Sequence, residues 1–255
     1  MLTHILRETT VPPVAHVTCV GSSYAEATTV IRDFLDAGIT RFLALRGDPP
    51  AGVGEDDIVV GDLESAAQLV QLIGRVQAER SPYREREIPG LPGAVQVTDG
   101  DRVEIAVAAF PNGHPRSRHR YEDIDALLAK QAAGATSALT QLFFHADEYL
   151  DFVERARAAG VVIPIVPGIM PITSPGRLRR VLELTGDARP DSLAAALESA
   201  PDAAAQRAVG LAHAADLARS VVAGGADGIH LYAFNNHDTV LGVLRAAELI
   251  PEASP

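Results

Sequence analysis

The chain has 255 residues, 47% of them hydrophobic, and a formal net charge of −11 at pH 7. This length fits one α/β barrel or two small domains, and the negative charge argues against nucleic acid as a partner, because phosphate binding needs a positive surface. No apolar run reaches the roughly 20 residues of a membrane span, the first residues lack the order of a signal peptide, and Cys19 is the single cysteine. We therefore expect a cytoplasmic protein that does not contact a membrane.

Short apolar segments alternate with helical patterns along the chain. Strands are predicted at residues 14–20, 41–45, 103–110, 137–144, 161–166 and 228–232. Helices that precede four of these strands end at Gly38, Gly134, Gly160 and the Gly224/Gly225 pair, and glycine just after a helix supplies a left-handed C-terminal cap. Strands that alternate with helices pair in parallel through right-handed crossovers, so the sequence predicts an α/β protein with a parallel sheet.

The segments between the strands carry signals of helix initiation. Ser22 or Ser23 with Glu26 resembles a capping box, and Ser174 followed by Pro175 is an N-cap with proline at the first helical position. Further helices are predicted at residues 66–76, 121–133, 146–159, 204–223 and 238–249. Residues 81–100, rich in Pro, Gly, Glu and Arg, are too many for an ordinary connection, so we expect an exposed insertion in a single domain over residues 1–255.

The six predicted strands allow two architectures. A closed (β/α)8 barrel has eight strands, whereas six also suit an open, doubly wound sheet. Neither a Gly-x-Gly-x-x-Gly sequence nor a P-loop occurs, so both common nucleotide fingerprints are missing. The number of strands alone does not decide between the two folds.

Polar residues mark the carboxyl ends of the predicted strands, where parallel α/β folds bind their ligands. They are His16 and Cys19, residues 46–48, the 111–115 turn, Gln141, the 167–171 turn and residues 235–237. Arg46 and Asp48 form a charged pair after a buried strand, which indicates catalysis or ligand binding, although a surface turn has the same composition. A lone histidine such as His16 in an apolar strand fits a hydrogen-bonded core residue as well as a ligand contact.

Two other reaction classes are disfavoured. His114 and His119 have no third ligand at a convincing spacing, so no metal site is expected. Lys130, the single lysine in an arginine-rich chain, lies within a predicted helix and not at a strand end. A Schiff-base aldolase needs its lysine inside the barrel and is therefore not expected.

Seven stretches of the sequence resemble the methylenetetrahydrofolate reductase family. They are AHVTC at 15–19, GITRFLALRGDPP at 38–50, AAFPNGHP at 108–115, KQAAGA at 130–135, TQLFF at 140–144, VPGIMP at 166–171 and LYAFN at 231–235. The resemblance implies a TIM-type (β/α)8 barrel that is incomplete at its N-terminus, with six parallel strands recognisable. It also implies a flavoprotein that passes hydride from NAD(P)H to FAD and then to 5,10-methylenetetrahydrofolate, giving 5-methyltetrahydrofolate.

The resemblance also concerns the start of the chain. Met1 aligns inside the second helix of the family, so the first two family strands, which carry the catalytic glutamate, have no counterpart. The chain as written is therefore expected to be poorly soluble or flavin-poor, with little reductase activity. An upstream extension of roughly 50–60 residues, about two βα units, is expected to restore both.

The resemblance assigns site residues by position. The residues implied to bind FAD are His16, Leu45, Arg46, Gly47, Asp48, Ala66, Phe110, His114, Asp123, Ala126, Ala129 and Lys130. Asp48 and Gln141 are implied to be catalytic, Asp48 as a carboxylate beside the flavin that tunes hydride transfer and Gln141 as a contact of both pterin and nicotinamide. Asp48, Gln141, Arg177 and Asn236 are implied to bind the folate.

Several positions depart from the family pattern. Phe110 replaces a tyrosine, and Ala126 and Ala129 replace polar or basic FAD contacts. Asn236 replaces an arginine and Arg177 a glutamine that face the glutamyl tail of folate. Two alternatives therefore stay open, a flavin- or folate-binding protein without turnover and another FAD-linked barrel oxidoreductase of the proline dehydrogenase type. The choice between NADH and NADPH, and whether the chain forms a homo-oligomer, also stays open.

Overall fold

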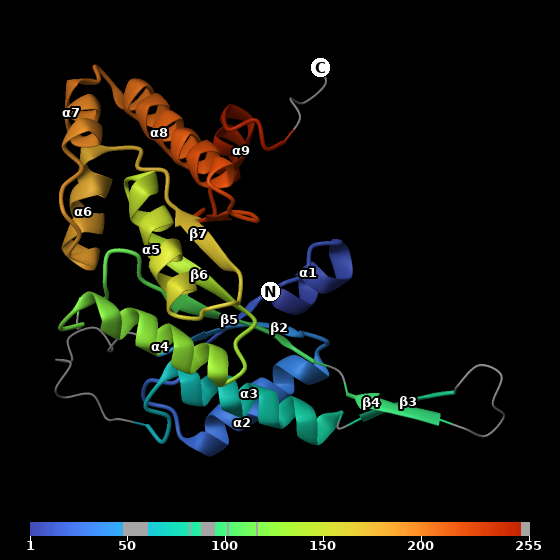
Figure 1. Cartoon of the computed structure of the whole chain (residues 1–255). Coiled ribbons are helices and arrows are strands. Elements are labelled where there is room, and N and C mark those ends of the chain that lie inside the picture. The colour runs from blue at the N-terminus through green and yellow to red at the C-terminus, as the bar shows by residue number, and fades with distance from the viewer. Residues whose placement is uncertain (48–60, 82, 88–94, 101, 116, 251–255) are drawn as a thin grey trace. The chain divides into compact units, whose positions relative to one another are not determined.

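The computed structural model describes residues 1–47, 61–81, 83–87, 95–100, 102–115 and 117–250, with the backbone alone for 83–87, 95–99 and Arg120. Six strands form one sheet (Figure 1). They are β1 (Ala15–Thr18), β2 (Arg41–Leu45), β5 (Glu104–Ala109), β6 (Ser137–Leu142), β7 (Ile165–Ile169) and β8 (His230–Leu231). Five of them lie within segments that the sequence predicts as strands, whereas β7 overlaps its predicted segment, 161–166, only at Ile165 and Val166.

The order of these strands decides between the two architectures. They are neighbours in the order β1-β2-β5-β6-β7-β8, which follows the chain without the central reversal of a doubly wound sheet. The pairing is parallel, with Ala15 opposite Phe42, Phe42 opposite Ile105 and Gly168 opposite His230. The six parallel strands therefore belong to an incomplete TIM-type (β/α)8 barrel, as predicted, and the doubly wound alternative is wrong.

The chain divides into two compact units. The first unit comprises Met1–Ala108 and Leu127–Ala138, and the second Ala109–Ala126 and Leu139–Pro255. The first contains α1 (Leu2–Glu8), α2 (Tyr24–Asp36) and α3 (Ala66–Arg80), the second contains α5 (Ala146–Ala158), α6 (Pro175–Thr185), α7 (Asp191–Ser199), α8 (Ala203–Ala223) and α9 (His237–Ala246), and α4 (Arg120–Ala132) contributes to both.

A second, two-stranded sheet lies within the segment predicted as an insertion. Its strands β3 (Tyr83–Glu87) and β4 (Val95–Asp99) pair antiparallel (Figure 1). Neither this pair nor helix α7 is predicted from the sequence. The antiparallel pairing separates these strands from the parallel sheet in which β1 and β2 lie.

The predicted helix–strand turns are confirmed by the backbone. Gly38, Gly134, Gly160 and Gly225 have φ angles of 83°, 110°, 100° and 97°. These angles lie in the left-handed region, which a side chain at Cβ disfavours and glycine adopts freely. Glycine at each position therefore lets a helix end and the chain turn directly into the next element.

The predicted helix starts are also confirmed, whereas the extent of one strand is not. Ser23 and Glu26 form a reciprocal capping box on α2, and Ser174 caps α6 with Pro175 at its first turn. The predicted turn at 167–171 is wrong in its first half, because β7 continues through Ile169. Gly168 continues the strand because its backbone N–H donates to Thr140 Oγ1 at 2.8 Å. This bond satisfies the N–H group within the sheet, so no turn is needed at this position.

The core of the first unit contains large side chains from β2, α2 and α3. Phe42, Ile31, Leu69 and Ile73 are almost fully buried. Burial of aliphatic and aromatic side chains of this size is the main stabilising contribution, at about 1.5–3 kcal/mol each. The apolar stripes of α2 and α3 therefore attach these two helices to the sheet.

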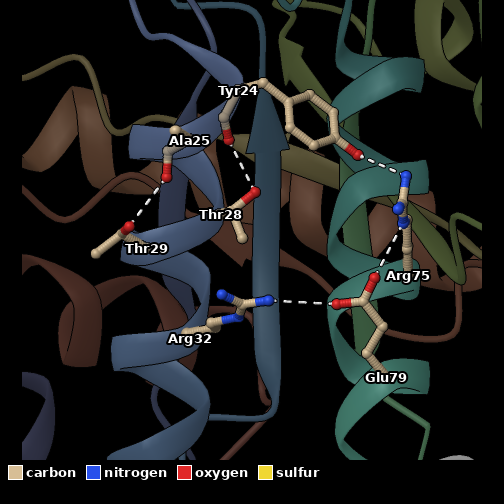
Figure 2. A network of polar contacts seen from close by, with 7 residues as sticks. All are labelled: Tyr24, Ala25, Thr28, Thr29, Arg32, Arg75 and Glu79. Carbon is tan, nitrogen blue, oxygen red and sulfur yellow. Dashed lines mark hydrogen bonds and ion pairs between the residues drawn. The ribbon is translucent and has the colours of Figure 1, made fainter.

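Polar side chains join α2 and α3 on their solvent side (Figure 2). Glu79 accepts from Arg32 at 3.3 Å and from Arg75 at 3.1 Å, and Arg75 donates to the Tyr24 hydroxyl at 3.3 Å. The charged side chains are about half exposed, and exposed ion pairs contribute roughly 0–1 kcal/mol. We interpret this network as a support of helix packing and not as a ligand site.

The second unit has its own core beneath α6, α7 and α8. The buried residues that form it are Leu142, Phe144, Ile172, Leu178, Val181, Leu193, Ala194 and Leu197. Helix α8 approaches the chain closely at Gly210, where a Cβ would lie 2.0 Å from the carbonyl oxygen of Ile172. Only glycine allows this approach, which places α8 next to the segment after β7.

One partly buried histidine links α8 to the segment after β6 and makes stability depend on pH. His213 Nε2 lies 3.1 Å from the carbonyl oxygen of Phe144. Burial lowers the pKa of His213, the Phe144 carbonyl opposes this shift, His145 adds to it and Asp216 opposes it. The unfolded chain, with an ordinary histidine pKa near 6.5, therefore binds more protons than the folded chain at mildly acidic pH.

We expect the free energy of unfolding to fall as the pH drops below about 6.5, because protonation of His213 favours the unfolded state. Urea unfolding at pH 7.5 and at pH 5.5 measures this decrease. In His213→Gln the decrease should be smaller, whereas the exposed His4→Gln should behave as the wild type. An equal decrease in all three proteins would contradict the assignment.

Candidate functional site

The carboxyl ends of β1 and β2 form the candidate site region of the first unit. The N–H groups of Cys19 and Val20 donate to the Arg46 carbonyl oxygen at 3.2 and 2.9 Å, which extends the pairing beyond the two strands. The Cys19 thiol also donates to this oxygen at 3.5 Å, and burial raises the pKa of Cys19, so the thiol stays protonated. His16 is exposed on β1 and is therefore not a core histidine.

β2 ends at Leu45, and Arg46 and Gly47 follow it at this edge. Leu45 and Arg46 are partly buried, and Gly47 has a φ angle of 91°. A Cβ at Gly47 would lie 2.9 Å from Thr18 Cβ, so both the backbone angle and the space require glycine. Asp48, predicted as catalytic, lies outside the described residues.

Three further predicted residues of the first unit lie on helices. Ala66 is buried at the start of α3, and Ala129 is exposed on α4. Lys130, in the last turn of α4, donates through Nζ to the carbonyl oxygen of Ala108 at 2.8 Å. The single lysine therefore places its charge beside the carboxyl end of β5, which its position within a helix does not predict.

In the second unit the turn after β5 carries two aromatic rings. The rings of Phe110 and His114 meet edge to face with centroids 4.7 Å apart. Gly113, with a φ angle of 94°, donates its N–H to the Phe110 carbonyl oxygen at 3.2 Å and closes the turn. Two predicted site residues are thus brought together by a turn that needs glycine.

A buried carboxylate on α4 holds this turn. Asp123 Oδ1 accepts from the backbone N–H of His114 at 3.2 Å and from Ser117 Oγ at 2.9 Å. Asp123 is only 9% exposed, and its Oδ2 is buried without a hydrogen-bond partner among the described residues. A buried acceptor without a partner is costly, so this oxygen is a candidate ligand contact. Ala126, one turn further along α4, is exposed.

Two residues of this arrangement are not predicted from the sequence. Ser117 becomes recognisable only through its bond to Asp123, although a serine three residues before a helix with an acidic first turn is a weak signal. Asp187, after α6, accepts from Asn112 Nδ2 of the same turn at 3.2 Å, and its Oδ2 is likewise buried without a partner in the described part of the chain. The turn after β5 is thus held by two carboxylates.

Gln141 is the penultimate residue of β6, and the surrounding strands fix its backbone. Its amide oxygen accepts from the N–H of Leu142 at 3.0 Å. The preceding residue, Thr140, is fully buried, and its carbonyl oxygen accepts from the Tyr232 hydroxyl at 3.0 Å. Burial raises the pKa of Tyr232, so this phenol keeps the proton that it donates. Tyr232 and Thr140, neither of them predicted, hold the strand end that carries Gln141.

Arg177 and Asn236 follow β7 and β8. The Arg177 guanidinium lies over the Phe234 ring, with its carbon 5.2 Å from the centroid. Asn236 caps α9, with its Oδ1 accepting from the N–H of Thr239 at 3.1 Å. The Arg177 side chain is thus exposed at the surface. Asn236 Oδ1, in contrast, already accepts a hydrogen bond from the start of α9.

Metal ligation and membrane insertion find no support in the described residues. Across this part of the chain no group of three or more His, Cys, Asp or Glu side chains could hold a metal ion. No helix within it is long and apolar enough to cross a bilayer.

Comparison with known proteins identifies the family. The sequence model of the family described as methylenetetrahydrofolate reductase matches residues 1–248. The chain belongs to the methylenetetrahydrofolate reductase family. This match confirms the resemblance and includes all six strands of the parallel sheet.

Individual relatives agree with the family. A probable methylenetetrahydrofolate reductase (NADH) of Oryza sativa subsp. japonica is 32% identical over 251 residues, covering 93% of this chain and 38% of the relative. The 5,10-methylenetetrahydrofolate reductase of Salmonella typhimurium is 29% identical over 221 residues, covering 86% of this chain and 64% of the relative. The chain thus spans less than two thirds of the length of these relatives.

A solved structure has a fold similar to that of this chain. An uncharacterised protein from Clostridium thermocellum, solved with two copies of 5-methyl-5,6,7,8-tetrahydrofolic acid, matches with a TM-score of 0.56 and 12% sequence identity. The match covers 96% of this chain and 74% of that protein. At this identity the similarity concerns the fold alone.

Proposed function

We propose that this chain reduces 5,10-methylenetetrahydrofolate to 5-methyltetrahydrofolate with a reduced nicotinamide through FAD. The family match over residues 1–248 carries this proposal, because it includes every strand end at which a candidate residue lies. NADH is the proposed donor, since the plant relatives are named for it. The match to the reductase family disfavours a proline dehydrogenase type of activity.

The described residues fit FAD in each unit. In the second unit, Asp123 Oδ2 is a buried acceptor suited to a hydroxyl group of the ligand, and the Phe110 and His114 rings offer flat surfaces beside it. In the first unit, Lys130 and Arg46 supply positive charge suited to phosphate. FAD, when bound, supplies the hydride relay between nicotinamide and folate. Asp48 is proposed as the carboxylate beside the flavin.

Removing the charge of Lys130 should weaken FAD binding. In Lys130→Met the dissociation constant for FAD is expected to rise, corresponding to about 1–3 kcal/mol, because one charge-assisted contact is lost. Lys130→Arg, which keeps the charge, is the matched control. Fluorescence titration with FAD measures the constants, and urea unfolding checks the contact of Lys130 with β5. Unchanged affinity in Lys130→Met would show that the phosphates bind elsewhere.

Folate is the proposed electron acceptor, and the methyltetrahydrofolate bound by the Clostridium thermocellum protein supports a ligand of this class. Gln141 is the proposed contact of the pterin. Its carboxamide offers both a donor and an acceptor, which suits a ring that presents alternating N–H and C=O groups. The bonds of Thr140 to Gly168 and Tyr232 keep this strand end in place when the Gln141 side chain turns from Leu142 toward a ligand.

Two half-reactions test the function. The FAD-loaded chain is reduced anaerobically with NADH and then mixed with 5,10-methylenetetrahydrofolate, while the flavin absorbance is followed. Reduction followed by reoxidation, with formation of 5-methyltetrahydrofolate, is the expected result. A protein that binds 5-methyltetrahydrofolate but neither reduces nor reoxidises flavin would instead be a binding protein without turnover, which is the alternative that the Clostridium thermocellum protein favours.

Gln141→Ala should slow both half-reactions. Nicotinamide and pterin are proposed to contact the same side chain in turn, so loss of the carboxamide affects each step. An effect of about tenfold or more is expected from the loss of one well-placed hydrogen bond. Gln206→Ala, the same truncation in the first turn of α8, is the control. Slowing of one half-reaction alone would separate the two binding sites.

A further inference from the structure

The two oxygens of the Asp123 carboxylate have different surroundings. Oδ1 accepts from the backbone N–H of His114 at 3.2 Å and from the Ser117 hydroxyl at 2.9 Å. A carboxylate oxygen offers about two lone-pair sites, so these two donors occupy Oδ1 fully. Oδ2 is buried and accepts from none of the described residues. Within this one side chain, Oδ2 is therefore the oxygen left to accept from a ligand.

The local sequence brings both donors to the same oxygen. The N–H of Ser117 donates to the His114 carbonyl oxygen at 2.8 Å, which closes a β-turn with Pro115 at its second position. Proline suits this position because its ring fixes φ at about −65°. The turn reverses the chain between His114 and Ser117. The N–H of the first residue and the hydroxyl of the second thus converge on Asp123.

Helix α4 satisfies its own beginning with a different carboxylate. Glu122 Oε2 accepts from the backbone N–H of Arg118 at 2.7 Å, and Glu122 Oε1 accepts from the Arg118 guanidinium at 2.9 Å. An acidic side chain in the first turn of a helix commonly accepts from N–H groups at this end. Asp123, the next residue of the same helical turn, directs its carboxylate to the turn after β5 instead.

The space beside Oδ2 adjoins Gly113. A Cβ at Gly113 would lie 3.6 Å from Asp123 Oδ2. The φ angle of Gly113 is 94°, which residues with a side chain rarely adopt, so the turn itself favours glycine at this position. Oδ2 is therefore a polar atom that borders a place where the backbone keeps a side chain away.

The Ser117 hydroxyl fixes which oxygen of Asp123 borders this place. The torsion that rotates an aspartate carboxylate is broad and roughly twofold, so a single donor does not hold its plane. A second donor from another direction does, and bonds to a charged acceptor belong to the stronger class. Loss of the hydroxyl leaves the His114 bond intact but lets the carboxylate rotate, so Oδ2 keeps its direction for only part of the time.

We propose that Ser117 is a positioning residue for FAD, whose hydroxyl holds the Asp123 carboxylate with Oδ2 toward a hydroxyl group of the cofactor. This inference rests on the proposed function, in which Oδ2 is the acceptor of that group. An acceptor that is oriented before the ligand arrives raises affinity, because the side chain loses less freedom on binding. Ser117 acts through Asp123 and does not itself contact the cofactor.

A double-mutant cycle in the full chain tests the proposal by fluorescence titration with FAD. Ser117→Ala should raise the dissociation constant for FAD about three- to tenfold, as expected for one hydrogen bond. In the Asp123→Asn background, which lacks the acceptor at Oδ2, the same change should alter the constant by less than about twofold. The control is Ser199→Ala at the end of α7, which removes a hydroxyl that donates to the Ala196 carbonyl oxygen and should leave FAD affinity unchanged.

A second variant covers the case in which Ser117→Ala folds poorly, as measured by urea unfolding of the flavin-free protein. Ser117→Cys keeps the size of the side chain but has a thiol, which is a weak donor, so it should also weaken FAD binding.

Weaker binding that depends on Asp123 supports the inference. Equal weakening by Ser117→Ala in the wild-type and Asp123→Asn backgrounds shows a general effect on the turn and overturns it. Unchanged affinity in both single Ser117 variants overturns the inference but leaves the proposed function standing. Failure of the wild type to bind FAD overturns both.

Discussion

Gly168→Ala is expected to prevent the chain from folding stably. A Cβ at this position would lie 2.2 Å from the carbonyl oxygen of Thr140 and 3.0 Å from Cε2 of Tyr232. The Thr140 oxygen belongs to the backbone of a fully buried residue, so it cannot move away without separating β6 from β7. We expect a loss of at least about 3–4 kcal/mol in the free energy of unfolding. Urea unfolding, or the soluble fraction after expression, measures it.

Two further variants are compared with Gly168→Ala: a control that adds the same methyl group elsewhere, and a variant that removes one hydrogen bond of Thr140. Gly176→Ala adds the same methyl group where nothing lies within 4 Å, in the first turn of α6, and should be neutral or slightly stabilising. Tyr232→Phe removes only the bond to Thr140 and should cost about 1 kcal/mol. Wild-type stability of Gly168→Ala would contradict the close approach of Gly168 to the Thr140 carbonyl.

Asp123→Asn is expected to weaken FAD binding about 10- to 100-fold without destabilising the flavin-free protein. Asparagine keeps an oxygen in the place of Oδ1, which accepts from His114 and Ser117, and changes the buried Oδ2 from an acceptor to a donor. A hydroxyl group of the ligand that donates to Oδ2 thereby loses its acceptor. The flavin-free protein should keep or gain stability, because burying a charged carboxylate whose Oδ2 has no partner in the described chain costs more than burying a neutral amide.

The control for this variant is Asp187→Asn. Asp187 contacts the same turn through Asn112 and also has a buried oxygen without a partner in the described chain, so the chemical change is the same. FAD affinity should stay close to that of the wild type. Equal weakening in both variants would indicate a general effect on the turn and not a contact of Asp123 with the ligand. Fluorescence titration and urea unfolding measure the two quantities.

The sequence by itself determined the alternation of strands and helices and many of their ends. The capping box of Ser23 with Glu26, the cap at Ser174 and the left-handed turns at Gly38 and Gly160 are all present as predicted. These features depend on hydrogen bonds and backbone angles within a few residues, so the local sequence contains the information. The family was recognisable for a related reason, since its motifs are short contiguous stretches at the strand ends.

Only the tertiary structure decided which side chains of the site meet. The strand order that excludes a doubly wound sheet, the bond of Lys130 to β5 and the contact of Arg177 with Phe234 join residues far apart in the sequence. The same holds for Gly168, whose place in β7 depends on the Thr140 side chain of another strand. Such contacts follow from packing between distant segments, which no local pattern specifies, because burial and register are set by the partner strand as much as by the residue itself.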